Sequence, residues 1–140
     1  MSLVECELAQ LIMSEMQGHG IVELKEKDGE RRLPIVIGLW EIHAIHRRVH
    51  NEPPPRPMTH ELFGNVLDAL GVTIERAVIN DLRVLENSRE GTFFGRLIVK
   101  QDGKTFDIDS RPSDAIALAV QKGAPIFVEE SVLHEASQES

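Results

Sequence analysis

The chain has 140 residues, of which 41% are hydrophobic and 27% charged, a composition typical of one globular domain. Its 15 Lys and Arg against 23 Asp and Glu give a net charge of −8, which excludes general electrostatic attraction of nucleic acid over the whole surface. There is no Tyr, which excludes a tyrosyl–phosphate intermediate, and the single Cys6 cannot form an internal disulfide.

Apolar runs are short, and none approaches the roughly 20 residues of a membrane-spanning helix. The first residues carry neither a basic segment nor a long apolar segment, so the sequence predicts no secretory signal. A lone cysteine fits a reducing compartment. We therefore expect a cytoplasmic protein without a membrane partner.

Alternation of apolar and polar residues predicts three strands in the first part of the chain, over residues 4–12, 21–25 and 32–37. Residues 13–20, with two glycines, predict a connection, and Asp28-Gly29 predicts a hairpin turn. From Trp40 to Val49 apolar residues recur at three-then-four spacing, which predicts a helix. Four prolines within residues 53–57 exclude a helix and predict a rigid loop.

A second helix is predicted over residues 60–70, with Thr59 as its cap and Gly71 as its end. Its apolar face consists of Leu62, Phe63, Val66, Leu67 and Leu70. The rest of this part of the chain is rich in strand-forming residues over 72–85, 92–101 and 104–109, with turns predicted over 87–91 and at Asp102-Gly103.

The stretch from Ile108 to Gly123 predicts the central element of the fold. Ala115 to Val120 is apolar on every side, so a helix here must be buried on every side. Pro112 suits the first turn, Ser110 is the expected cap, and Gly123 is the expected end. A last strand is predicted over 124–129, and 131–140 is a polar tail that is either a short helix or loose.

The two Asp-Gly hairpins are each followed by a strand and a helix, which suggests two halves built alike. We therefore predict an α+β fold, in which mostly antiparallel β-hairpins pack around the buried helix, together with two further helices. The domain organisation expected is a single domain over residues 1–140, with a core over about residues 4–133.

Polar residues crowd the start of the central helix. Asp109 and Asp114 could hold a divalent cation while Arg111 binds a phosphate oxygen. The alternative is a helix start that satisfies itself, in which Ser110 and Asp114 cap the helix and Arg111 pairs with Asp109. The spacing of these residues leaves both interpretations open.

Three further groups have a functional and a structural interpretation. Glu41 and Glu61 each open a helix near a histidine and would become metal ligands only by approaching Asp109 or Asp114. Trp40 could stack on a base, or lie in the core or in a subunit contact. A stripe of histidines on the first helix could bind zinc or nickel, although a solvated helix face explains it as well; it consists of His43, His46 and His50.

Several segments resemble the bifunctional nuclease (BFN) family: residues 33–38, Glu41 with Ala44-Ile45, residues 56–62, residues 109–119 and residues 125–129. The resemblance extends over about residues 4–133, and the run Arg-Pro-Ser-Asp-Ala-Ile-Ala-Leu-Ala is its most specific part. It implies an α+β fold and nuclease activity on RNA and DNA. The positions that match the family's motifs are Glu41, His60, Glu61, Asp109, Arg111, Ser113 and Asp114.

The hypothesis that follows is a metal-assisted nuclease. Asp109 and Asp114, with Glu41 or Glu61, would hold Mg²⁺ or Mn²⁺. Arg111 would stabilise charge on the phosphate and contact the substrate together with Ser113, and His60 would act as general base or acid.

The alternative is a non-enzymatic module, either an oligomeric scaffold or a protein that binds a small ligand, in which Arg111 and Asp114 are structural. The hairpins, Trp40 and the proline-rich loop also predict a homo-oligomer.

Overall fold

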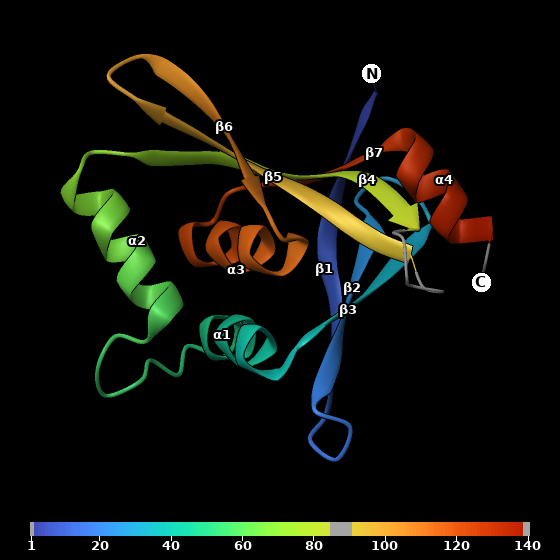
Figure 1. Ribbon diagram of the computed structural model, residues 1–140, viewed down its shortest axis with the longest axis horizontal. Helices are drawn as coiled ribbons and strands as arrows, with labels where there is room; N and C mark the ends of the chain where they lie inside the picture. The colour runs from blue at the N-terminus through green and yellow to red at the C-terminus, as the bar shows by residue number, and fades with distance from the viewer. Residues whose placement is uncertain (1, 85–90, 139–140) are drawn as a thin grey trace.

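The computed structural model describes residues 2–84 and 91–138. Within them the chain forms an α+β fold with a curled, mostly antiparallel sheet and helices packed mainly on one side of it (Figure 1). The elements in chain order are β1 (Leu3–Ser14), β2 (His19–Glu26), β3 (Arg32–Gly38), α1 (Leu39–Val49), α2 (Thr59–Ala69), β4 (Thr73–Val84), β5 (Gly91–Gln101), β6 (Lys104–Ser110), α3 (Pro112–Lys122), β7 (Ile126–Glu129) and α4 (Glu130–Gln138).

The sheet has the strand order β3-β2-β1-β7-β4-β5-β6. Each half is a run of three consecutive antiparallel strands followed by a helix: β1-β2-β3 with α1, and β4-β5-β6 with α3. β7 lies between the halves, antiparallel to β1 and parallel to β4. The predicted similarity of the two halves is therefore confirmed, and a single short strand joins them.

The central helix predicted from the sequence is α3, and its buried residues include every position from Ala115 to Ala119. It packs against α1 and α2 on one side and against β4 and β5 on the other. Pro112 is its first residue, and Gly123 ends it with a φ of 69°, a backbone conformation that favours glycine.

Two predicted helix caps are wrong. The residue before α3 is Arg111, in an extended conformation, and the hydroxyl of Ser110 donates to the carbonyl oxygen of Arg111 instead of capping the helix. Thr59 is the first residue of α2 and not its cap. The residue before α2 is Met58, whose backbone N–H donates to Glu61 Oε1 at 3.0 Å.

Some element boundaries also differ from the prediction. β1 and β2 extend into the predicted connection at residues 13–20, because their backbone pairing continues to Ser14 and His19. Most of the turn predicted over 87–91 lies outside the described residues, and Gly91 begins β5. The C-terminal tail forms α4, which Arg31 links to the β2–β3 hairpin through ion pairs with Glu26 and Glu130.

The hydrophobic core draws on both halves of the sheet and on α1, α3 and α4. α2 contributes little, since Leu67 is its only hydrophobic side chain packed against the core. No helix within residues 2–84 and 91–138 is long and apolar enough to cross a membrane.

Candidate functional site

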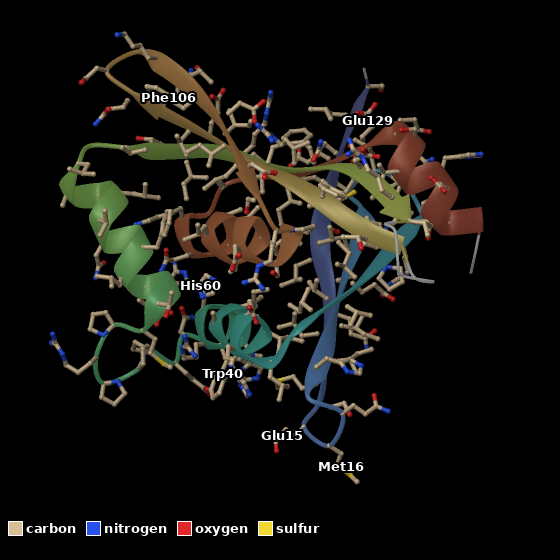
Figure 2. All side chains as sticks on the ribbon, in the orientation of Figure 1. Glu15, Met16, Trp40, His60, Phe106 and Glu129 are labelled. Atoms are coloured by element: carbon tan, nitrogen blue, oxygen red, sulfur yellow. The ribbon has the colours of Figure 1, made fainter. Side chains whose placement is uncertain are left out.

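A cleft of about 730 Å³ opens at the start of α3, between the first turns of α1 and α2 and the end of β6. His60 lies at the start of α2, close to α1 and α3 (Figure 2). The cleft has a charged side and an apolar side. Its charged side chains include Glu41, His60, Arg111 and Asp114, and its apolar ones include Trp40, Met58, Phe63 and Ile108.

Asp114 is the centre of the charged side. Its Oδ1 lies 2.9 Å from His60 Nε2, and its Oδ2 accepts a hydrogen bond of 2.8 Å from Arg111 Nε. The hydrogen bond from His60, followed by that from Arg111, lowers the pKa of Asp114 to about 2, against the opposing effect of burial. Asp114 is therefore ionised at neutral pH and can only accept hydrogen bonds.

Arg111 joins the start of α3 to the start of α1. Its Nη2 donates to Glu41 Oε1 at 2.7 Å and to Asp114 Oδ1 at 3.1 Å. These hydrogen bonds, first that to Asp114, raise the pKa of Arg111 above its ordinary value. The side chain is nevertheless 65% exposed, and the described residues leave the two N–H groups of Nη1 without a partner.

The junction between β3 and α1 fixes the position of the Glu41 side chain. It lies in the first turn of α1, where the helix dipole favours a carboxylate, and its side chain is largely buried. A Cβ at Gly38 would overlap Glu41 Oε2. Glycine at position 38 therefore leaves the space in which Glu41 turns toward Arg111.

Glu61 belongs to a second, separate pair. Both of its carboxylate oxygens lie 3.1 Å from Arg47 Nη2, and Oε1 also accepts the backbone N–H of Met58. Glu61 thus caps α2 and neutralises Arg47. Its contacts are not with Asp114 or Glu41.

Asp109 lies away from this network because of the alternation of side chains along β6. In the β5–β6 register Asp109 pairs with Arg96, whereas Ile108 pairs with the buried Leu97. Successive side chains of a strand point to opposite faces of the sheet. The Asp109 side chain is 80% exposed, and its carboxylate contacts Arg96 at 3.4 Å instead of Asp114. Asp109 nevertheless lines the cleft, beside Ile108 and Ser110.

The carboxylates predicted as metal ligands do not gather around one point. Within residues 2–84 and 91–138, no group of three or more His, Cys, Asp or Glu side chains is placed to hold a metal ion. Arg111, and not an ion, neutralises Asp114 and Glu41 in this arrangement, so the donor set does not fit a divalent cation as it stands. Binding of Mg²⁺ or Mn²⁺ stays a prediction.

The remaining candidate residues are Ser113, Trp40 and the stripe of histidines. Ser113 is buried in the first turn of α3 and does not line the cleft, so a bound substrate would not reach it directly. Trp40 is 77% exposed, which excludes the core and leaves base stacking and a subunit contact as predictions. The ring of His46, in the last turn of α1, stacks on that of His50, the residue after α1, with centroids 4.0 Å apart. A function for this stripe, which includes His43, is untested.

A family model described as Bifunctional nuclease domain matches residues 22–140. The chain belongs to this family. Two proteins of Mycobacterium tuberculosis are similar to it: "Uncharacterized protein Rv1829" of strain ATCC 25618 / H37Rv and "Uncharacterized protein MT1877" of strain CDC 1551 / Oshkosh. Each is 37% identical over 132 residues, which cover 94% of this chain and 75% of the relative.

Membership of the bifunctional nuclease domain family confirms the resemblance found in the sequence and favours a nuclease-related function. Sequence reasoning selected Glu41, His60, Arg111 and Asp114, which the fold brings together. It missed how they are connected: Arg111 bridges Glu41 and Asp114, and Asp114 also contacts His60. It also missed Arg47 as the partner of Glu61, for which the only available signal was a cation on the last turn of the preceding helix.

Proposed function

We propose that this protein is a phosphodiesterase that acts on single-stranded RNA or DNA in the cleft at the start of α3. The observation that carries the proposal is the exposed guanidinium of Arg111 beside the His60–Asp114 pair, in a cleft large enough for a nucleotide. Membership of the bifunctional nuclease domain family supports the same chemistry.

Arg111 is the residue that binds the phosphate. The hydrogen bonds to Glu41 and Asp114 fix the plane of its guanidinium and direct the two N–H groups of Nη1 away from those carboxylates. A guanidinium fixed in this way can donate the two hydrogen bonds of Nη1, which diverge from one nitrogen, to phosphate oxygens. The same contact stabilises the negative charge that grows on the phosphate as water attacks.

His60 is the residue that moves a proton. Because Asp114 is ionised, Nε2 of His60 donates to it and Nδ1 is left as the basic nitrogen. Nδ1 takes a proton from the attacking water, and Asp114 stabilises the imidazolium that forms. The ester oxygen that leaves the phosphorus atom takes a proton from solvent.

The apolar side of the cleft favours an unpaired substrate. The indole of Trp40 is exposed at the cleft, and an exposed aromatic ring stacks on the bases of single strands whatever their sequence. The net charge of −8 opposes long contacts with phosphates, so binding should use only the few phosphates near Arg111. We therefore expect a short recognition length and weak dependence on salt.

The lone tryptophan gives a direct test of binding. Fluorescence excited at the red edge of indole absorption reports Trp40 alone, because the chain has one Trp and no Tyr. We expect single-stranded oligonucleotides to quench it, and base-free polyphosphate to leave it unchanged. If oligonucleotides quench the fluorescence of Arg111→Ala as strongly as that of the unmodified chain, the result would argue against a phosphate contact at this cleft.

Cleavage is tested on labelled single-stranded and double-stranded RNA and DNA, with Mg²⁺, with Mn²⁺ and with EDTA. We expect single strands to be cut, and His60→Gln and Asp114→Asn each to lower the rate by about 10² or more. Activity in EDTA would argue that the cation prediction is wrong, whereas activity that requires Mg²⁺ or Mn²⁺ would imply that Arg111 moves off Asp114 to admit the ion.

A non-enzymatic module is the second candidate, and one specific observation favours it. Arg111 already satisfies Glu41 and Asp114, so the group can serve simply to hold the start of α3 to α1. In that case Asp114→Ala would lower the midpoint of thermal unfolding by several degrees, and no substrate would be cleaved. Because Asp114 also contributes to the stability of the enzyme, a lower midpoint alone does not separate the two candidates. Cleavage by the unmodified chain that Asp114→Ala abolishes at a temperature where both proteins are folded would argue for the enzyme.

A further inference from the structure

The apolar face of α2 is turned to solvent. At 3.6 residues per turn, Leu62, Phe63 and Val66 of α2 and Leu70 directly after it fall within an arc of roughly 100°. Each of these four side chains is between 47 and 61% exposed. The side of α2 that faces α3 carries instead Gly64, the one residue of the helix that is buried, and His60. An amphipathic helix normally packs its apolar stripe against a core.

β6 adds a second uncovered apolar face. It is an edge strand of the sheet, and all of its residues except Ser110 are exposed. Phe106 and Ile108, two residues apart and therefore on one face, are 45 and 44% exposed. Figure 1 shows the β5–β6 hairpin projecting past the helices above α2, and Figure 2 labels Phe106 on this hairpin.

The two faces form one surface, because Phe63 of α2 and Ile108 of β6 line the same cleft. We call it the α2–β6 surface. Its residues are Met58, Leu62, Phe63, Val66, Leu70, Phe106 and Ile108. Half of the fourteen exposed large hydrophobic side chains in the described part of the chain lie on it.

The size of this surface can be compared with known interfaces. Only Phe63 and Phe106 are aromatic, so with about half of each side chain exposed and about 150 Å² for an average side chain of the seven, the exposed apolar area is about 500 Å². This is near the upper end of the largest apolar patch on a typical monomer, about 300–600 Å², and such patches are often functional. A standard protein–protein interface buries about 800 Å² on each partner, of which somewhat more than half is apolar, so this surface supplies the apolar part of one side.

We propose that the α2–β6 surface binds the same surface of a second copy of this chain. A contact between identical surfaces related by a two-fold axis closes as a dimer and needs no other partner. The unpaired edge of β6 has free backbone N–H and C=O groups that the β6 edge of the second copy can pair with.

The proposal places the partner differently from the sequence analysis, which inferred self-association from Trp40 and the proline-rich loop. It also does not depend on nuclease activity. Since Met58, Phe63 and Ile108 belong to both the α2–β6 surface and the cleft, a second copy bound there borders the cleft.

The mass of the full chain in solution tests the proposal. Sedimentation equilibrium should give twice the chain mass of 15.7 kDa at micromolar concentration. Because two acidic copies repel, association should strengthen as salt rises from about 0.05 M to about 0.5 M. A mass of one chain under both conditions would overturn the proposal and leave the surface to a different partner.

Paired valine variants identify the surface. Val66→Glu places a charge in the middle of the apolar stripe of α2. Because glutamate is a good helix former, we expect the variant to fold, and the dissociation constant of its dimer to be about 100-fold higher. Val36→Glu is the matched control, an exposed valine on β3 at the opposite edge of the sheet, and should leave the dimer intact. Dimers unaffected by Val66→Glu would overturn the proposal.

Hydrogen exchange tests the proposal on the unmodified chain, so the result does not depend on whether a variant folds. Comparison of dilute and concentrated samples should reveal protection that grows with concentration in residues 59–70 and 104–110. Protection that grows only elsewhere in the chain would place the contact between copies on another surface and contradict the proposal.

Discussion

His60 Nε2 lies 2.9 Å from Asp114 Oδ1, although 54 positions separate the two residues in the chain. The contact joins the start of α2 to the start of α3. It also holds Asp114 ionised to low pH, with the pKa of its carboxyl at about 2. Stability and chemistry at this site therefore depend on the same carboxylate, and the two can be separated by experiment.

Asp114 should make stability depend on pH below about 4. Its pKa is about 2 in the folded chain and about 3.9 in an unfolded one, so the unfolded chain binds more protons between these values. The stabilisation is present above pH 4 and is lost as pH falls through 2. We expect Asp114→Asn to remove about 1 kcal/mol at pH 7, after allowance for solvent screening, and almost nothing near pH 2.

Urea unfolding between pH 2 and pH 7 measures this difference. Asp109→Asn is the control, because its carboxylate is 80% exposed and the substitution should leave the free energy of unfolding nearly unchanged. Equal pH profiles for Asp114→Asn and the unmodified chain would contradict the role assigned to His60 and Arg111.

Arg111→Lys tests whether the shape of the guanidinium matters beyond its charge. A lysine keeps the positive charge but cannot contact Glu41, Asp114 and a phosphate in one plane. We expect the rate of cleavage to fall by about 10², with a larger effect on kcat than on KM. Arg56→Lys, in the exposed proline-rich loop, is the control and should behave as the unmodified chain. Full activity of Arg111→Lys would show that a positive charge suffices and that the planar guanidinium is not required.

Gly95→Ala should disturb the junction between β6 and α3. A Cβ at this position would lie 3.1 Å from the backbone N and Cα of Pro112 and from the carbonyl oxygen of Ser110. Backbone atoms cannot move aside as a side chain can, so we expect a loss of about 1–2 kcal/mol and a lower midpoint of thermal unfolding.

Gly91→Ala is the matched control for this change, because its Cβ would meet only the end of the flexible Leu82 side chain. Its effect should be clearly the smaller of the two. If Gly95→Ala does not lower the midpoint of thermal unfolding, the start of α3 can shift without a loss in the free energy of unfolding.

Cys6 should be unreactive in the folded chain. Burial, followed by the charge of Glu26, raises the pKa of its thiol to about 11, so about one thiol in 10³ is ionised at pH 8. We expect a thiol-specific disulfide reagent to label the folded protein far more slowly than the protein in urea. Equal labelling rates in the two conditions would show that β1 opens readily.

The sequence was sufficient to predict α3, because Ala115–Ala119 has no polar face and a helix without a polar face must be buried. It was not sufficient for Asp109. Whether Asp109 meets Asp114 depends on the face of β6 on which it lies, and on where that strand ends and α3 begins. A shift of one residue would have exchanged the faces of Ile108 and Asp109.

The contact between Glu41 and Arg111 also had no local signal, since 70 positions separate the residues and the packing of α1 against α3 brings them together. α2 illustrates a different limit. The spacing of Leu62, Val66 and Leu70 predicts an apolar stripe correctly, but a stripe packed on its own core and one turned to solvent have the same pattern.

The position of β7 has a consequence for how the protein is made. The strand that connects the two halves of the sheet, Ile126–Glu129, is synthesised after both halves. Until then each half has an unpaired edge strand, β1 in one half and β4 in the other. On the ribosome, completion of the sheet is therefore delayed until the last elements emerge. A chain cut short before Ile126 would leave two open edges, which makes truncated products candidates for aggregation and proteolysis.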